Sequence, residues 1–168
     1  MNSSGWDRFR EQAETELSQI RELIAKFAEA IERSRSSTPE FIEGAGLAGM
    51  LHSFYSGVEN VMERASIEID EDPLKGEAWH KALLKKMRET TARRSAVISE
   101  EMLARLTPYL AFRHYYRNSY ATTVRWELMA PLVHNCSDVL SQFEKEIHFF
   151  LKQAPASNPD DPSPSGAT

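Results

Sequence analysis

The chain has 168 residues, of which 41% are hydrophobic and 27% are charged, and this is the size and composition of one globular domain with a full core. Only seven glycines are present, which argues against a loop-rich or all-β design. The formal net charge is −5, and no stretch approaches the roughly 18 apolar residues that a membrane span needs, so a membrane-spanning protein is excluded.

The single cysteine and the first residues indicate where the protein works. Cys136 has no second cysteine with which to form an internal disulfide, which is typical of a reducing compartment. The opening residues MNSSGWDRFREQ lack the basic and apolar segments of a secretory signal. We therefore expect a cytoplasmic protein.

Apolar residues recur at steps of three and four in two long segments of the first half of the chain. Residues 6–33 are predicted to form one amphipathic helix, with Ala13, Leu17, Ile20, Ile24, Phe27 and Ile31 on its inner face. Thr38 followed by Pro39 is a helix start signal for the next segment, which ends at DEDPLKG. Its inward positions are Leu47, Leu51, Phe54, Val58, Val61, Ala65 and Ile69.

Three further helices are predicted in the second half. The first covers about residues 77–90, with Trp79, Leu83 and Met87 inward. Ser99, with two glutamates directly after it, starts the next, although Pro108 is expected to bend that helix or delay its true start. The last helix covers about residues 126–152 and carries Cys136, Val139, Phe143, Ile147 and Phe150 on its inner face.

Five amphipathic segments with short connections predict an all-α fold, an antiparallel helical bundle in a single domain over residues 1–152. Residues 153–168, rich in proline, serine and aspartate, are predicted to be disordered. The five histidines form no HExxH-type pair and no ferritin-like pair of Glu-x-x-His motifs, and no phosphate-binding glycine loop is present. We therefore expect neither a metal nor a cofactor.

Charge is distributed unevenly along the chain. Residues 75–125 contain eleven lysines and arginines against four acidic residues, a net of +7, whereas the remainder carries −12. This asymmetry suggests a segment that faces a polyanion, with Lys85, Lys86 and Arg88 among its basic residues. The alternative from charge alone is a solvated helix face.

The densest part of this segment is AFRHYYRNSY, residues 111–120. In a helix, residues four apart share a face, which pairs Arg113 with Arg117 and His114 with Asn118. The same spacing pairs Tyr116 with Tyr120, so two polar faces and an aromatic face lie at one end of the helix.

Several ordered blocks resemble the HepT-like branch of the HEPN superfamily of bacterial helical-bundle toxins. They are HSFYSGVENVMERASIEID, PLKGEAWHKALLKKM, AVISEEMLARLTPYLAFRHYYRNSY and RWELMAPLV, and the likeness covers roughly residues 47–151. The resemblance implies a metal-independent endoribonuclease encoded beside a small nucleotidyltransferase antitoxin. The family motif is an arginine, a polar residue after it, a histidine four to six residues after the arginine, and often a tyrosine two residues further on.

In this sequence Arg113 matches the motif arginine, His114 the polar residue and Tyr120 the tyrosine, but Asn118 occupies the histidine position. By the resemblance, the histidine exchanges protons at the ribose 2′-hydroxyl or the leaving 5′-oxygen, and the arginine stabilises charge on the phosphorane. Asn118 can bind phosphate but has no titratable proton near neutral pH. Losing this role costs on the order of 10²–10⁴ in rate.

Three interpretations of the motif remain open at this point. In the first, Arg113 and Arg117 form salt bridges to acidic helices and have only a structural role. In the second, the chain binds RNA, partly through Arg117, and has lost most catalysis. In the third it is an active ribonuclease in which His114, one turn before Asn118, takes over proton transfer.

The resemblance also implies partners and a modification. Two motif helices would meet across a homodimer axis around one RNA cleft. The partner nucleotidyltransferase would attach AMP to Tyr120. The alternative from another functional class is a non-catalytic, antitoxin-like or regulatory partner of a nucleotidyltransferase.

Several other residues are assigned a structural role or no role from the sequence. Tyr55, Trp79 and Trp126 are expected to pack inward. Glu59 and Glu63, one helical turn apart, are interpreted as surface charges of a helix. His80, in the block GEAWH, has no assigned chemistry.

Overall fold

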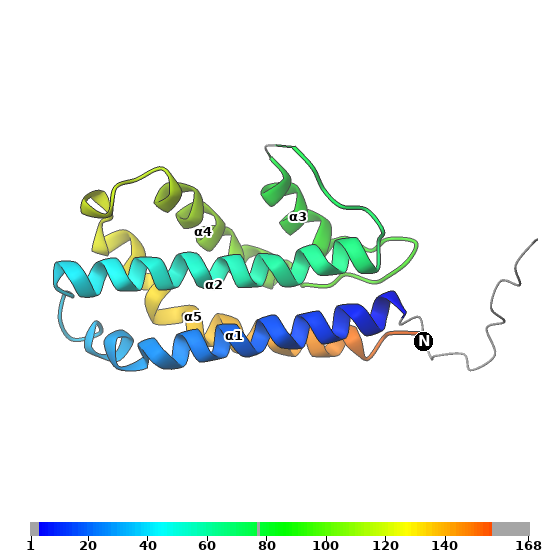
Figure 1. Cartoon of the computed structure of the whole chain (residues 1–168), viewed down its shortest axis with the longest axis horizontal. Coiled ribbons are helices and arrows are strands. Elements are labelled where there is room, and N and C mark those ends of the chain that lie inside the picture. The colour runs from blue at the N-terminus through cyan, green and yellow to red at the C-terminus, as the bar shows by residue number, and fades with distance from the viewer. Residues whose placement is uncertain (1–3, 77, 156–168) are drawn as a thin grey trace, which may run out of the picture.

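A computed structural model describes residues 4–76 and 78–155, and within these residues it is helical, with no strand (Figure 1). The expected all-α bundle of about five helices is confirmed. The elements are α1 (Gly5–Arg33), α2 (Phe41–Glu68), α3 (Trp79–Arg88), α4 (Glu100–Arg117), the 3-10 turn η1 (Ala121–Thr123) and α5 (Trp126–Leu151). No helix among the described residues is both long and apolar enough to cross a membrane.

The long helices α1 and α2 lie side by side and antiparallel, with α5 packed against both of them (Figure 1). Helices α1 and α2 approach closely at two glycines: a Cβ at Gly5 would lie 2.1 Å from the carbonyl oxygen of Glu68, and a Cβ at Gly57 would lie 2.6 Å from Cγ1 of Ile20. Glycine at these positions therefore allows the two helices to pack at this separation.

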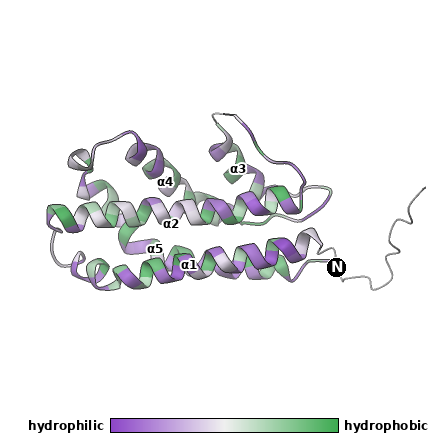
Figure 2. Ribbon diagram, in the orientation of Figure 1, coloured by the Kyte–Doolittle hydropathy of each residue, from purple (hydrophilic) through white to green (hydrophobic). Residues whose placement is uncertain are grey.

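Helix α2 is the centre of the bundle because it contacts each of the other four helices. A helix with neighbours on most sides is buried around most of its circumference. The buried residues of α2 accordingly include Tyr55, Glu59 and Ser66 as well as its apolar side chains. Along α1, which has a solvent-facing side, hydrophilic and hydrophobic residues alternate (Figure 2).

Most of the predicted core is confirmed. All the apolar positions expected to face inward in residues 47–69 and 126–152 are buried, and so are those of residues 6–33 except the half-buried Phe27. Tyr55 is fully buried, whereas Trp79 and Trp126 are partly buried and pack against the core. The predicted disordered tail lies outside the described residues from position 156 onward.

One predicted helix start is confirmed and one differs from the structure. Helix α4 begins at Glu100, directly after the predicted cap Ser99, and it continues through Pro108, so the alternative of a delayed start is wrong. The Ser99 hydroxyl accepts a hydrogen bond from the Met102 amide at 3.0 Å and fixes the first turn. The proline is exposed, so a carbonyl that loses its partner there can bond to water. Helix α2 begins only at Phe41, two residues after the predicted proline signal.

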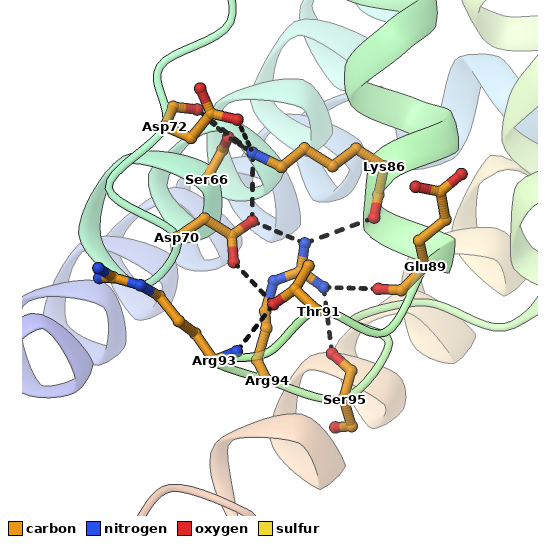
Figure 3. Close-up of polar contacts among 9 residues, drawn as sticks. All are labelled: Ser66, Asp70, Asp72, Lys86, Glu89, Thr91, Arg93, Arg94 and Ser95. Atoms are coloured by element: carbon orange, nitrogen blue, oxygen red, sulfur yellow. Dashed lines mark hydrogen bonds and ion pairs between the residues drawn. The ribbon is translucent and has the colours of Figure 1, made fainter.

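A buried ion-pair cluster joins the C-terminal ends of α2 and α3 to the loop before α4 (Figure 3). Asp70 lies between Lys86, at 3.3 Å, and Arg94, at 2.8 Å. The Arg94 side chain is 0% exposed and donates further hydrogen bonds to the carbonyl oxygens of Glu89 and Ser95. We call Asp70, Asp72, Lys86 and Arg94 the Asp70 cluster, and it anchors α3 and the following loop on α2.

Breaking this cluster should be costly. In Asp70→Asn the Arg94 guanidinium loses its charged partner in the interior, so we expect the free energy of unfolding to fall by roughly 3–5 kcal/mol. Urea denaturation followed by circular dichroism measures this loss.

The neighbouring residue provides a matched control. Glu71→Gln removes a carboxylate that pairs with Arg93 at 2.9 Å, but both side chains are more than half exposed. Its effect on stability should be much smaller, because water screens an exposed pair. Equal losses in the two variants would contradict a special role for the buried cluster.

Candidate functional site

Helix α2 presents three polar or aromatic side chains toward α3 and α4. His52, Tyr55 and Glu59 are spaced three and four residues apart and so lie along one stripe of the helix. His52 is half-buried near the surface, whereas Tyr55 and Glu59 are buried, at 0% and 3% exposure. The stripe therefore runs from the surface of the protein into its core.

The Glu59 carboxylate joins three helices. Its Oε2 lies 2.8 Å from Nδ1 of His80, the second residue of α3, and its Oε1 lies 3.5 Å from Nη2 of Arg113 on α4. The side chain of Glu59 is 4% exposed, and those of His80 and Arg113 are each 11% exposed. A buried charge needs such partners, since an isolated carboxylate in the interior is strongly destabilised. We call Tyr55, Glu59, His80 and Arg113 the Glu59 cluster.

The contacts of His80 identify its neutral tautomer. A carboxylate only accepts hydrogen bonds, so Nδ1 carries the proton that His80 donates to Glu59. The basic nitrogen of the neutral ring is then Nε2. Nη1 of Arg113 lies 3.3 Å from Nε2 and 3.5 Å from Nδ1. A donor on the Nε2 lone-pair axis would be about 5 Å from Nδ1, so the guanidinium does not occupy that lone pair.

The core side of the cluster is strongly desolvated. Burial is the largest cause that raises the pKa of Tyr55, and the negative charge of Glu59 raises it further. The Tyr55 hydroxyl is therefore neutral at all physiological pH values and does not serve as a base.

Further basic and aromatic side chains surround the cluster toward solvent. The ring of His114 meets that of His80 edge to face, with centroids 5.8 Å apart, and the ring of His52 lies 5.1 Å from that of Tyr116. Burial, and then the positive charges of Arg113 and Arg117, lower the pKa of His52. Three histidines and two arginines from three helices therefore gather on one face of the bundle.

The arrangement corrects the sequence interpretation of Glu59 and completes that of His80. Glu59 is not a surface charge, because α2 is covered on this side by α3 and α4. His80, to which sequence gave no chemistry, contacts both Glu59 and Arg113. The sequence contained one signal that Glu59 is buried: its carboxylate lies on a helix that is otherwise apolar around most of its circumference.

The motif residues of α4 divide between core and surface. Arg113 is buried in the Glu59 cluster, whereas His114, Arg117 and Asn118 are exposed. Asn118 is the residue that ends α4, and its Nδ2 donates to the carbonyl oxygen of His114 at 2.8 Å. Tyr120 follows with its side chain 83% exposed. The hydroxyl of Tyr120 is therefore accessible, as the modification hypothesis requires.

The basic residues of α3 lie at its other end. Lys86 contacts Asp72 at 2.9 Å in the Asp70 cluster, Arg88 pairs with Glu100, and Lys85 is exposed. A helical rise of about 1.5 Å per residue separates them from His80 by roughly 8–12 Å along the axis. The structure does not bring these three residues into the Glu59 cluster.

Much of the basic segment is neutralised by acidic residues. Among the described residues, at least seven of its eleven lysines and arginines form ion pairs: Lys86, Arg88, Arg93, Arg94, Arg105, Arg113 and Arg125. Arg117 is exposed, and its positive charge acts on His52. The net of +7 therefore overstates the charge that this segment presents to a polyanion.

A larger, mainly apolar groove lies elsewhere, between α4 and α5. It has a volume of about 730 Å³ and a mainly apolar lining that includes Phe112, Leu128 and Pro131. Its one charged lining residue, Arg105, pairs with Asp138. We place the candidate site at the Glu59 cluster because ionisable groups gather there. Among the described residues, no group of three or more His, Cys, Asp or Glu side chains is arranged to hold a metal ion.

The electrostatics of the site can be tested by titration. We expect NMR titration of His52 to give a pKa below that of an unperturbed histidine, and Arg117→Gln to raise that pKa by removing a neighbouring positive charge. Arg88→Gln, which removes a charge paired with Glu100 at the far end of α3, is the control and should change it less. An unchanged His52 pKa in the Arg117 variant would place Arg117 too far from the site to influence it.

Comparison with known proteins assigns most of this chain to one family. A family model described as HepT-like protein matches residues 46–154, which extend from α2 to just beyond α5 and include the whole Glu59 cluster. No curated protein and no solved structure matches the chain.

Proposed function

This chain belongs to the HepT-like family, and we propose that it is a HEPN-type RNA-binding protein with a weakened, metal-independent endoribonuclease site. The observation that carries the proposal is the convergence of Arg113 and Arg117 with His52, His80 and His114 on one face formed by α2, α3 and α4. An exposed arginine, Arg117, beside a second arginine and imidazole groups is suited to binding phosphate.

The weakening rests on the chemistry and position of Asn118. An amide does not exchange protons near neutral pH, and its Nδ2 is already used in a hydrogen bond to the end of α4. The motif histidine position therefore supplies a cap and a polar surface, but no general acid or base.

A homodimer would complete the site. Arg117, His114 and Asn118 are exposed at the end of α4, so two copies that meet there would place two sets of these groups around one strand of RNA. Such an arrangement doubles the local positive charge, which matters because most other basic residues of the segment are paired within the chain.

Binding should depend on salt. We expect fluorescence anisotropy with a labelled single-stranded RNA to show an affinity that falls roughly 5- to 50-fold between 50 and 200 mM salt, as for two to four phosphate contacts. Arg117→Gln should weaken binding and reduce the slope on salt. Arg21→Gln is the control, since Arg21 pairs with Glu144 between α1 and α5. Binding that is absent at low salt, or insensitive to salt, contradicts the proposal.

We also propose that a nucleotidyltransferase encoded nearby regulates the protein by attaching AMP to Tyr120. The side chain is 83% exposed and lies three residues after Arg117. Each AMP unit adds a negative phosphodiester and a base, which would engage the cations that RNA phosphates need and block access.

Mass spectrometry after co-expression with that enzyme should find AMP-sized additions on Tyr120 and none in Tyr120→Phe. Tyr115→Phe is a matched control, because the Tyr115 hydroxyl donates to the carbonyl oxygen of Thr123 at 2.6 Å and is only partly exposed. Its modification pattern should equal that of the unaltered chain. An unmodified Tyr120 rejects the regulatory proposal.

Asn118 also favours a second candidate function, that of a non-catalytic protein. A chain with no proton-transfer group at the motif position could serve as a non-catalytic, antitoxin-like partner of the nucleotidyltransferase, using the same face for binding only. Toxicity on expression distinguishes the two, since only the ribonuclease would degrade cellular RNA.

A further inference from the structure

We propose that His80, oriented by Glu59, is the proton-transfer residue of this site and takes the place of the missing histidine at position 118. The inference rests on the proposed function, because it assumes that RNA phosphate binds beside Arg113. It adds a catalytic residue, His80, and a positioning residue, Glu59, that lie outside the arginine-to-histidine motif of α4.

The geometry of the pair supports this role. The 2.8 Å hydrogen bond from Nδ1 to Glu59 holds the ring in the tautomer whose Nε2 is basic. A carboxylate in this position also stabilises the imidazolium that forms when the ring takes a proton. Glu59 is the more buried partner, at 4% side-chain exposure, and His80, at 11%, is the partner nearer to solvent.

Arg113 connects the Glu59–His80 pair to the expected phosphate-binding position. Its guanidinium contacts both Glu59 and the His80 ring, so a phosphate that binds Arg113 is brought next to the imidazole. The contact leaves the Nε2 lone-pair axis unoccupied, as the two nitrogen distances require. A general base needs this combination of a nearby substrate and a free lone pair.

His114 and Asn118 are less suited to the task. His114 is exposed and contacts the His80 ring only through an edge-to-face approach, with no carboxylate partner among its described contacts. Asn118 is not titratable and caps α4. Of the three candidates, only His80 has a described carboxylate partner that orients its ring.

The reaction follows from these positions. Nε2 of His80 takes the proton of a ribose 2′-hydroxyl, and the 2′-oxygen attacks phosphorus to form a new P–O bond. The P–O5′ bond breaks, and the departing 5′-oxygen takes a proton from water. The products are a 2′,3′-cyclic phosphate and a 5′-hydroxyl, and His80 returns its proton to solvent. Arg113 stabilises the charge that develops on the phosphorane oxygens.

The test compares variants of the full chain in the presence of EDTA. Cleavage of a labelled RNA is measured over pH, and binding is measured with a 2′-O-methyl RNA that lacks the reacting hydroxyl. His80→Asn places an amide nitrogen near the position of Nδ1, so the hydrogen bond to Glu59 can persist while the titratable group is lost. His148→Asn is the matched control, since His148 bonds to Glu14 at the same 2.8 Å on an exposed surface.

We expect slow cleavage by the unaltered chain, with 2′,3′-cyclic ends, and a 10²- to 10⁴-fold lower rate in His80→Asn with binding changed less than about twofold. The rate of the unaltered chain should rise from acidic toward neutral pH, as general-base catalysis requires, and this dependence on pH should be absent in His80→Asn. The charged and titratable groups facing His80 are Glu59 on α2 and Arg113 and His114 on α4. His148→Asn should retain the rate and its dependence on pH.

Each other outcome has a defined meaning. Binding without any cleavage overturns the role of His80 but leaves RNA binding in place, whereas no binding overturns the proposed function itself. Cleavage by His80→Asn at the original rate, with loss in His114→Ala, assigns proton transfer to His114 instead. If His80→Asn is thermally less stable than the unaltered chain, His80→Gln is measured in its place. A folded His80→Gln variant that cleaves RNA at the rate of the unaltered chain equally rejects the proposal.

Discussion

The buried carboxylate of Glu59 is the interaction on which this structure depends. It pairs with both α3 and α4, through His80 and Arg113, at the side of α2 that those helices cover. A carboxylate in the interior is tolerated only with such partners, so the packing of three helices and the placement of the two basic groups are coupled. A site built in this way is rigid, because moving any one member leaves the others uncompensated.

The polar cluster divides helix α4 into two functional parts. Arg113 belongs to the interior, where its guanidinium is held in place, whereas the last turn and the residues after it are exposed and accessible to ligands or partners. This division explains how ten residues can contain two arginines, a histidine, an asparagine and three tyrosines in an acidic protein. One face completes the core, and the other forms a surface.

The Asp70 cluster fixes the other end of α3 and shows how a basic segment can be mostly structural. Arg94 and Lys86 are tied to α2 by carboxylates from outside the segment, so their charge is not available to a polyanion. Counting charges along a chain cannot detect this, since the acidic partners lie far away in sequence. The family match includes both the Asp70 and the Glu59 clusters, which places them within the part of the chain shared with HepT-like proteins.

The sequence by itself determined the helices and most of the core, because helix periodicity and capping are local: the stripe of residues 6–33 and the Ser99 cap are found where they were expected. The sequence also identified the segment around Arg113, and Tyr120, as candidate functional residues. Only the tertiary structure decided that Glu59 is buried, that His80 is its partner and that Lys86 belongs to a separate cluster. These contacts join residues 14 to 54 positions apart in the sequence. Their existence depends on how the helices and the loop after α2 pack together, which no local pattern specifies.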